Sequence, residues 1–461
     1  MSSDPSPALL EPPPPVELTR RFWRLTALNV LTNLTVPLAS LVDTALLGHL
    51  PDIRFLAGVS LASVLFEYVY WTFGFLRMGT TGTTAQAFGA RQREEVYRVL
   101  YRSVLLAFGL GCLILMFRSP LRDLGFSLLS GSEATETAGR QYFDARILGA
   151  PAVLVNFGFL GWYLGREESR HALLMTVAAH ATNVVLDYIF IVRLGLAARG
   201  AGLATAISQY VMLATGVVIF LRSRRRREGA LSDRLIPAFD WREISAPSAL
   251  ARLFRLNLDI LIRTVLLVSA FAVFLNFSAL LGTIILAANT LLYRVQMLAA
   301  YFVDGAAFAT ESLAGIFQGA GDKRALLRLR RSALRIGLLL TLPFVVLVAL
   351  VPAQTYGVLT SHSATLETAI AHTAWLVPAL LLGSIAFIYD GYFLGLTRGR
   401  LLRNCMLVSS ILVFLPLALF ALRSQSNHLL WLAMTVFMAA RAATLWWSDR
   451  RLSSTTGLLD P

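Results

Sequence analysis

Two aspartates lie in stretches of the sequence that are otherwise almost wholly apolar. Asp43 sits in LVDTALLGHL, and Asp187 sits in NVVLDYIFI, where Asn183 precedes it by four residues and shares its face of a helix. Thr205, in GAGLATAISQY, adds a hydroxyl group. Two carboxyl groups, an amide and a hydroxyl make an oxygen-rich set that suits proton exchange or a hard monovalent cation such as Na⁺. The four residues are therefore a candidate cation-coupling site.

An ionisable side chain inside an apolar, membrane-length run is costly, so each one is a candidate functional residue. Two carboxylates that share such a site repel each other, and binding a proton or a metal cation relieves the repulsion. The alternative is that Asp43 and Asp187 only bind helix ends or interfacial water. The order of the apolar runs favours a cation-coupling site over this alternative. It predicts that Asp43, Asp187 and Thr205 lie at one depth near the outer surface.

A second set of charges lies in the other half of the chain. Asp259 and Arg263 are one helical turn apart and are predicted to pair, while Asp304 and Glu311 are two turns apart and share a face. Asp390 lies at a similar depth in a later run. The leading interpretation is a structural charge network, and the alternative is a second protonation site.

Composition places the chain in a membrane. The sequence has 461 residues, of which 56% are hydrophobic and only 15% are charged, with a mean hydropathy of +0.65. The net charge of +14 does not indicate nucleic-acid binding, because the arginines gather in the short segments between apolar runs. Cys112 and Cys405 lie far apart in apolar segments and suggest neither a disulfide nor a metal site. No motif of an enzyme or of a cofactor-binding fold stands out, so we expect neither catalysis nor a cofactor.

Twelve apolar runs are long enough to cross a bilayer, so the expected fold class is an all-α polytopic membrane protein. Lys and Arg are concentrated in alternate connections, and the positive-inside rule then predicts that both termini are cytoplasmic. The expected spans are 24–48, 57–86, 96–117, 137–164, 170–192, 201–221, 248–278, 283–316, 327–351, 366–395, 401–422 and 428–448.

The chain contains an internal repeat. GWYLG at Gly161 returns as GYFLG at Gly391, and FGA at Phe88 aligns with QGA at Gln318, both at an offset of 230 residues. Six spans per half give the two halves the same orientation, and we expect two six-helix lobes related by a pseudo-twofold axis. The expected divisions are a disordered tail (1–21), an N-terminal lobe (22–222), a cytoplasmic linker (223–243), a C-terminal lobe (244–448) and a second tail (449–461).

With these motifs together, the chain resembles the multidrug and toxic compound extrusion (MATE) family, in particular its DNA-damage-inducible protein F branch. The resemblance extends over YWTFGFLRMGTTGTTAQAFGA, LDILIRT, LAANTLLYRVQMLAAYFVDGAAFATESLAG and FIYDGYFLGLTRGR as well as the stretches quoted above. It implies that the four residues of the candidate site match the cation site of relatives, and that Asp304, Glu311 and Asp390 match acids of this branch. At the repeat offset Asp43 corresponds to Val273, so the second lobe has no copy of the site.

The resemblance implies an antiporter that exports amphipathic, often cationic organic compounds or drugs in exchange for H⁺ or Na⁺ by alternating access. We expect a monomer in the bacterial inner membrane, in contact with membrane lipids and not with nucleic acid. The alternative is a flippase or exporter of a lipid-linked precursor, which would favour a cleft lined with arginines for phosphate.

Overall fold

The computed structural model describes residues 15–129, 131–228 and 246–455, and within these residues every regular element is a helix. Twelve helices are long and apolar enough to cross a membrane, which confirms the expected fold class. The N-terminal lobe (N-lobe) consists of α1 (Pro15–Gly48), α2 (Arg54–Thr72), α3 (Phe75–Gly89), α4 (Arg93–Met116), α5 (Arg118–Ser127), α6 (Glu133–Arg146), η1 (Ile147–Gly149), α7 (Ala150–Gly165), α8 (Ser169–Asp187), η2 (Tyr188–Arg193) and α9 (Ala197–Glu228).

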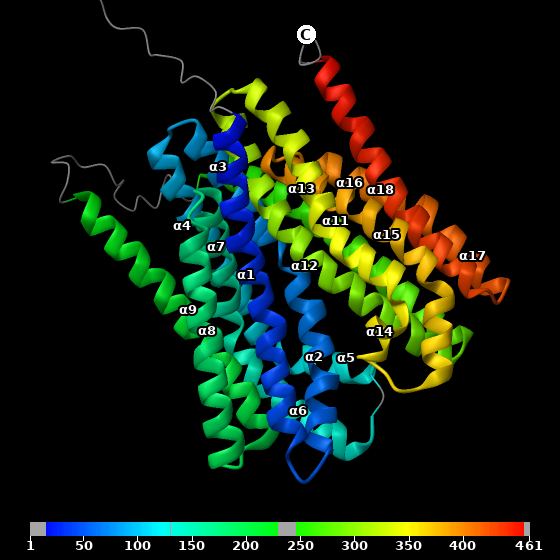
Figure 1. Ribbon diagram of the computed structural model, residues 1–461. Coiled ribbons are helices and arrows are strands. Elements are labelled where there is room, and N and C mark those ends of the chain that lie inside the picture. Colours follow the sequence, from blue (N-terminus) through cyan, green and yellow to red (C-terminus); the bar gives the residue numbers. More distant parts are fainter. Residues whose placement is uncertain (1–14, 130, 229–245, 456–461) are drawn as a thin grey trace, which may run out of the picture.

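The C-terminal lobe (C-lobe) repeats this order of elements (Figure 1). Spans two, four, five and eleven are each interrupted, by a short break or by a 3₁₀ or π segment, and the other spans are single helices. The C-lobe consists of α11 (Pro247–Leu281), α12 (Thr283–Gly319), α13 (Lys323–Leu350), α14 (Pro352–Gly357), α15 (Ser363–Gly395), α16 (Gly399–Leu407), η3 (Val408–Phe414), α17 (Leu415–Arg423) and α18 (Asn427–Thr455).

The repeat extends to the conformation of single residues. The turns after α3 and α12 both contain a residue with positive φ, Arg91 (59°) and Gly321 (71°), which are 230 positions apart. The turns after α7 and α15 also contain residues with positive φ at equivalent positions, Glu167 (59°) and Thr397 (53°). A left-handed residue after the last helical turn ends a helix by satisfying its free carbonyl groups, so both lobes end these helices in the same way. The pseudo-twofold arrangement is thereby confirmed.

Several expected boundaries need correction. Helix α1 begins at Pro15, so residues 15–21 are helical rather than part of a tail, and residues 1–14 lie outside the described part of the chain. Helix α9 continues to Glu228 into the expected linker, of which 229–243 are not described. Helix α18 continues to Thr455, beyond the expected lobe end at 448. The apolar pattern marks where a helix is buried in lipid, whereas a helix can extend past that point.

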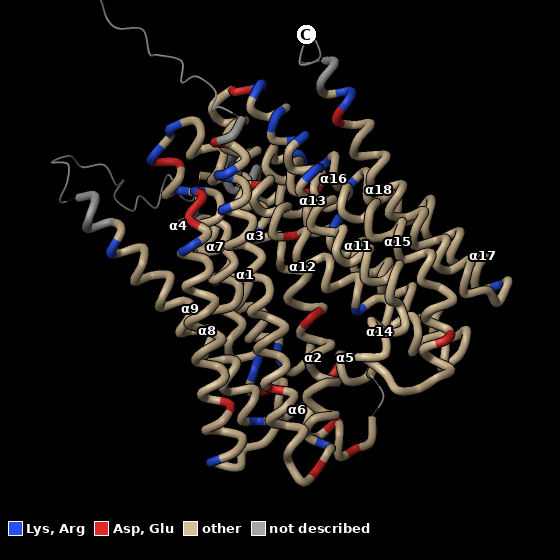
Figure 2. The backbone as a smooth tube through the Cα atoms, in the orientation of Figure 1, with Lys and Arg blue, Asp and Glu red and all other residues tan. Residues whose placement is uncertain are grey.

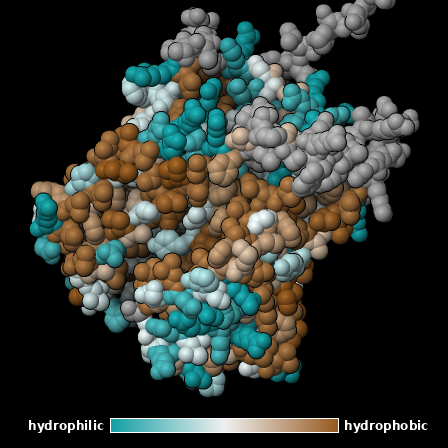
Figure 3. Space-filling view, turned by 180° about the vertical axis from the view of Figure 1, so that it is seen from behind, coloured by the Kyte–Doolittle hydropathy of each residue, from teal (hydrophilic) through white to brown (hydrophobic). Residues whose placement is uncertain are grey.

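The two ends of the described chain lie at one end of the bundle, which we call the terminal face; the opposite end is the distal face (Figure 1). Lys and Arg gather near the terminal face (Figure 2). A broad hydrophobic surface separates hydrophilic ends (Figure 3), as expected for a bundle surrounded by lipid.

The lobes share a core only toward the terminal face. One apolar core runs through the N-lobe and continues into the terminal halves of α12 and α15, where Leu313 and Phe393 are fully buried. A separate core around Phe274 and Trp431 fills the distal half of the C-lobe. The lobes thus share an apolar core near the terminal face, whereas the distal half of the C-lobe has a core of its own.

Glycines make this shared contact possible. A Cβ atom on Gly89 would lie 2.0 Å from the carbonyl oxygen of Ile316, and one on Gly319 would lie 2.0 Å from that of Gln86. Gly89 and Gly319 are repeat equivalents, so the terminal-side contact between α3 and α12 is itself nearly symmetric. Only glycine lets two helix backbones approach this closely.

Candidate functional site

The structure brings Asp43 and Asp187 together. Asp43 lies near the distal end of α1, Asp187 is the last residue of α8, and their carboxyl groups face each other within hydrogen-bonding reach. Asp187 is fully buried, and no donor group in the described part of the chain reaches either of its oxygens. Two carboxyl groups in this position form a hydrogen bond only when one of them carries a proton. The pair can therefore bind a proton, or a cation placed between its oxygens.

Asn183 and Thr205 lie on elements next to the pair. Asn183 is one turn before Asp187 on α8, 5% exposed, and its amide nitrogen has no hydrogen-bond partner in the described residues. Thr205 is on α9, which packs on α8 and also contacts α1. Its hydroxyl donates to the carbonyl of Ala201 at 2.9 Å, and no described contact joins it to either carboxyl group. The structure thus brings Asp43 and Asp187 together, with Asn183 one turn away on α8 and Thr205 on the neighbouring helix α9.

The backbone beside Asp187 is unusual. Helix α8 ends at Asp187, and the chain continues as the π-helix η2, Tyr188–Arg193. A π segment widens the helix and is common at functional sites because it shifts the register of the side chains before it. Nothing in the sequence pattern predicted this feature.

One further residue of this site, Arg146, was missed by the sequence analysis. Arg146 is at the end of α6, its charge acts on Asp43, and it donates to the hydroxyl of Tyr142 at 2.7 Å. Its guanidinium group also lies over the ring of Phe66, with 4.5 Å to the centroid. The available signal was a lone arginine within an apolar span, the same criterion that drew attention to the aspartates.

Helix α1 connects this site to the other lobe. In its terminal half, the amides of Asn29 and Asn33 donate to the α12 carbonyls of Gly305 and Tyr301, at 3.2 and 3.1 Å. Its distal half carries Asp43 against α8 of its own lobe, so α1 contacts both lobes. Pro37 lies between them and lacks the N–H that would bond to the carbonyl of Asn33, which makes this turn the natural bending point.

The C-lobe charges form a different kind of structure. Asp390 on α15 accepts from Arg263 on α11 at 2.8 Å and from Arg441 on α18 at 2.7 Å, and all three are buried. The expected pair of Asp259 with Arg263 is wrong, because Asp259 binds Arg403 at 2.6 Å instead. One helical turn allows two side chains to meet, but here each finds a closer partner on a neighbouring helix.

Glu311 and Asp304 differ in their surroundings. Glu311 on α12 is fully buried and accepts from Arg77 on α3 at 3.3 Å, across the boundary between the lobes. The guanidinium group of Arg77 also stacks on Phe308, with 3.9 Å to the ring centroid. Asp304 has no ion pair among the described residues and is half-buried, although Arg77 acts on it electrostatically.

Among the described residues, no group of three His, Cys, Asp or Glu side chains is placed to hold a metal ion. The sets described above instead resemble the sites of membrane transporters: an isolated carboxyl pair in one lobe, a charge network in the other, and a helix that links the two lobes. A two-lobe bundle with these intramembrane charges belongs to the class of secondary transporters.

The particular family follows from comparison with known proteins. The MatE family model matches the chain twice, at residues 29–189 and 260–420, so the chain belongs to the MatE family of multidrug and toxic compound efflux transporters. The two matches fall on the two lobes. Members of this family are ion-coupled transporters and not enzymes, and they need no cofactor.

Individual relatives agree with this assignment. The chain is 36% identical to DNA damage-inducible protein F of Escherichia coli over 92% of its own length and 91% of that protein's length. It is 25% identical to the probable multidrug resistance protein NorM of Thermotoga maritima, covering 76% of this chain and 74% of that one.

Solved structures share the fold. A MOP superfamily transporter from Pyrococcus furiosus, for which a reverse polarity of the binding pocket suggests a different function, matches with a TM-score of 0.84 at 21% identity, covering 95% of this chain and 96% of that one. An outward-facing multidrug resistance MATE family transporter matches with a TM-score of 0.84 at 22% identity, covering 95% and 97%.

Proposed function

We propose that this protein is an antiporter of the bacterial inner membrane, which exports amphipathic, often cationic organic compounds in exchange for protons or sodium ions. In this proposal the terminal face is cytoplasmic and the distal face is external, as the positive-inside rule predicts. The single observation that carries the proposal is the pair of Asp43 and Asp187, a half-buried and a fully buried carboxyl group that face each other, with no donor to either oxygen of Asp187 in the described residues.

The pair is well placed to couple ion binding to movement. Asp43 is on α1, which is bound to the C-lobe through Asn29 and Asn33, whereas Asp187 is on α8 of the N-lobe. When both carboxyl groups are ionised they repel each other, and the distal part of α1 is released from α8. A bound proton or cation holds the two helices together, so loading selects one position of α1 about Pro37.

Of the two ions, the proton is better supported by the geometry. Carboxyl groups within hydrogen-bonding reach match a shared proton, which forms one short O–H···O bond. A sodium ion needs several oxygen ligands around it, and among the described residues the hydroxyl of Thr205 donates to the carbonyl of Ala201 rather than to the pair. In the C-lobe, Asp304 is an acid without an ion pair among the described residues, and its carboxyl group is a candidate contact for a cationic substrate.

Substrates that carry phosphate are less well supported. Arg263 and Arg441 of the C-lobe both bind Asp390, Arg77 of the N-lobe binds Glu311, and the charge of Asp304 acts on all three arginines, so three buried arginines face three acids. A phosphate-bearing precursor would need cations that lack such partners.

The test is efflux of a fluorescent organic cation from proteoliposomes that contain the full chain, with proton and sodium gradients imposed separately. We expect the proton gradient to drive efflux and Asp43→Asn to reduce it at least about tenfold. Asp52→Asn, on a half-exposed carboxylate of the same lobe, is the matched control and should have no effect. Unchanged gradient-driven efflux in Asp43→Asn would remove the basis of the proposal.

A further inference from the structure

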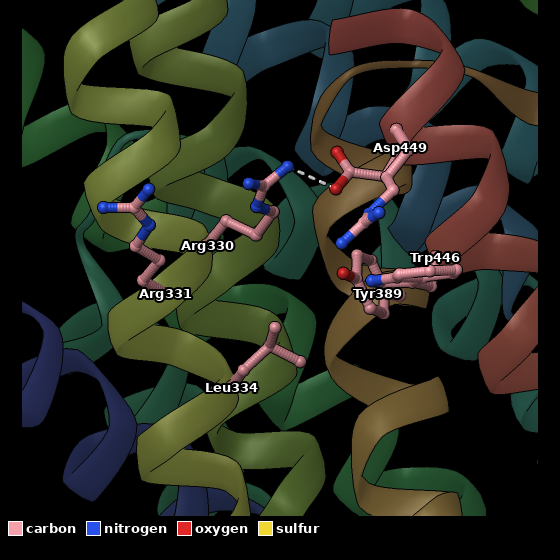
Figure 4. A pocket seen from close by; sticks show the side chains of 7 residues that line it. Arg330, Arg331, Leu334, Tyr389, Trp446 and Asp449 are labelled. Carbon is pink, nitrogen blue, oxygen red and sulfur yellow. Dashed lines mark hydrogen bonds and ion pairs between the residues drawn. The ribbon is translucent and has the colours of Figure 1, made fainter. Parts of the chain in front are cut away.

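A pocket opens near the terminal face of the C-lobe, between α13, α15 and α18. Its volume is about 520 Å³, and Figure 4 shows Arg330 on α13 reaching toward Asp449 on α18, while Arg331 projects to the other side of α13. The lining residues are Arg330, Arg331, Leu334, Tyr389, Trp446, Asp449 and Arg450. The pocket is separate from both charge sets described above and has no part in the proposed transport mechanism.

The pocket has an excess of positive charge. Arg330 is ion-paired with Asp449, which neutralises one of the three arginines. Arg331 and Arg450 are exposed and have no carboxylate partner in the described part of the chain. The guanidinium group of Arg450 lies over the ring of Trp446, with 4.2 Å to the centroid, which holds it at the rim of the pocket. The lining therefore has two more arginines than carboxylates, and guanidinium groups suit a phosphate group.

The pocket lies at the depth of lipid headgroups. Arg330 is seven residues into α13, or about 10 Å along the helix from its terminal end. Trp446 and Trp447, near the end of the last span, are 43% and 52% exposed. Exposed tryptophans at the end of a span mark the interface between hydrocarbon and water. Below Arg331, the face of α13 continues with Leu334, Leu338 and Leu342, along which an acyl chain can lie.

The equivalent place in the N-lobe is lined by uncharged residues. At the repeat offset Arg330 corresponds to Leu100, Arg450 to Phe220 and Trp446 to Gly216. Phe220 fills the space and packs on Trp162 with ring centroids 5.6 Å apart. None of the seven repeat-equivalent positions carries a charge: Leu100, Tyr101, Val104, Phe159, Gly216, Ile219 and Phe220. The pocket is therefore not a by-product of the shared fold.

We propose that this pocket binds the phosphate headgroup of an anionic phospholipid from the leaflet at the terminal face. A zwitterionic lipid brings its own cation and does not match the two uncompensated arginines. A lipid with a net negative headgroup, such as phosphatidylglycerol, matches their charge, the depth of the pocket and the apolar path along α13.

The test is a lipid titration of the full-length protein in detergent, with bound lipid counted by native mass spectrometry. We expect phosphatidylglycerol to bind more tightly than phosphatidylcholine, and Arg331→Gln combined with Arg450→Gln to weaken its binding at least about tenfold. Arg20→Gln combined with Arg24→Gln is the matched control, because it removes two exposed arginines from α1 near the same face and should leave this binding unchanged.

A second measurement identifies the location and the source of the phosphate. In vesicles, phosphatidylglycerol that carries bromine near its headgroup should quench part of the tryptophan fluorescence of the protein. The quenched part should be the part that is missing in Trp446→Phe. Equal affinity in wild type and the pocket variant would overturn the proposal. So would displacement of the lipid by an equal concentration of inorganic phosphate, since the pocket would then be a site for a soluble anion.

Discussion

The two lobes share a scaffold and differ in how they treat buried charge. In the N-lobe, Asp43 and Asp187 face each other with no protein donor to satisfy Asp187, and the cation acting on Asp43, Arg146, is engaged with Tyr142. In the C-lobe, Asp390 is held between Arg263 and Arg441. One arrangement leaves carboxyl oxygens without a donor, and in the other the carboxylate accepts from two arginines.

This difference separates a titratable site from a structural one. A buried carboxylate held between two arginines has its hydrogen-bond donors in place, and removing it leaves buried cations without their partner. A carboxyl pair has the opposite property, because adding one cation lowers its energy. A repeat that fixes helix positions in both lobes therefore leaves each lobe free to have its own chemistry.

The largest effect is expected where a complete network is broken. Asp390→Asn leaves Arg263 and Arg441 as buried cations without a counterion, and should destabilise the protein by about 3–5 kcal/mol. Thermal unfolding in detergent measures this as a lower Tm. Asp259→Asn is the matched control, because its partner Arg403 is 31% exposed and stays hydrated, so the loss should be about 1 kcal/mol or less. A variant of Asp390 as stable as wild type would show that the C-lobe network is not structural.

Much of the fold could be read from the sequence because membrane burial leaves a strong pattern. Twelve apolar runs gave the twelve spans, and the offset of Gly161 and Gly391 predicted the repeat that the positive-φ residues of the turns confirm. Helix ends were less predictable, because an apolar run ends where contact with lipid ends and the helix can continue beyond it. Helix α1, for example, begins at Pro15.

The site was only partly predictable, because pairing across helices depends on side-chain direction. Equal depth was enough to bring Asp43 and Asp187 together as candidates. It did not reveal Arg146, nor that Asp259 turns to Arg403 instead of its neighbour Arg263. Local spacing gives a list of possible partners, and only the packing of the helices selects among them.

The shared part of the two lobes can be tested at their closest contact. Gly89→Ala and Gly319→Ala each place a Cβ atom 2.0 Å from a backbone carbonyl oxygen of the other lobe, and should weaken the terminal-side contact by about 1–3 kcal/mol. Spin labels on the exposed distal residues Leu41 and Leu280 should then move closer together, as the lobes rock open on the terminal side. Gly109→Ala, which has nothing within 4 Å, is the control. If only one of the two glycine variants changes the distance between the spin labels, the two glycines do not contribute equally to the contact between α3 and α12.

The smallest expected change in stability is that of Asp187→Asn, and it is the one change that does not destabilise the protein. Asp187→Asn replaces a buried carboxyl group that lacks a protein donor by a neutral amide, which can donate to Asp43. Because no buried cation is left behind, we expect the free energy of unfolding to stay the same or to rise by about 1 kcal/mol. In detergent this is measured as an unchanged or higher Tm. Gradient-driven efflux should nevertheless be lost, so stability and transport change independently. A loss of stability as large as that of Asp390→Asn would mean that the N-lobe pair is a structural element, and the distinction between the lobes would then fail.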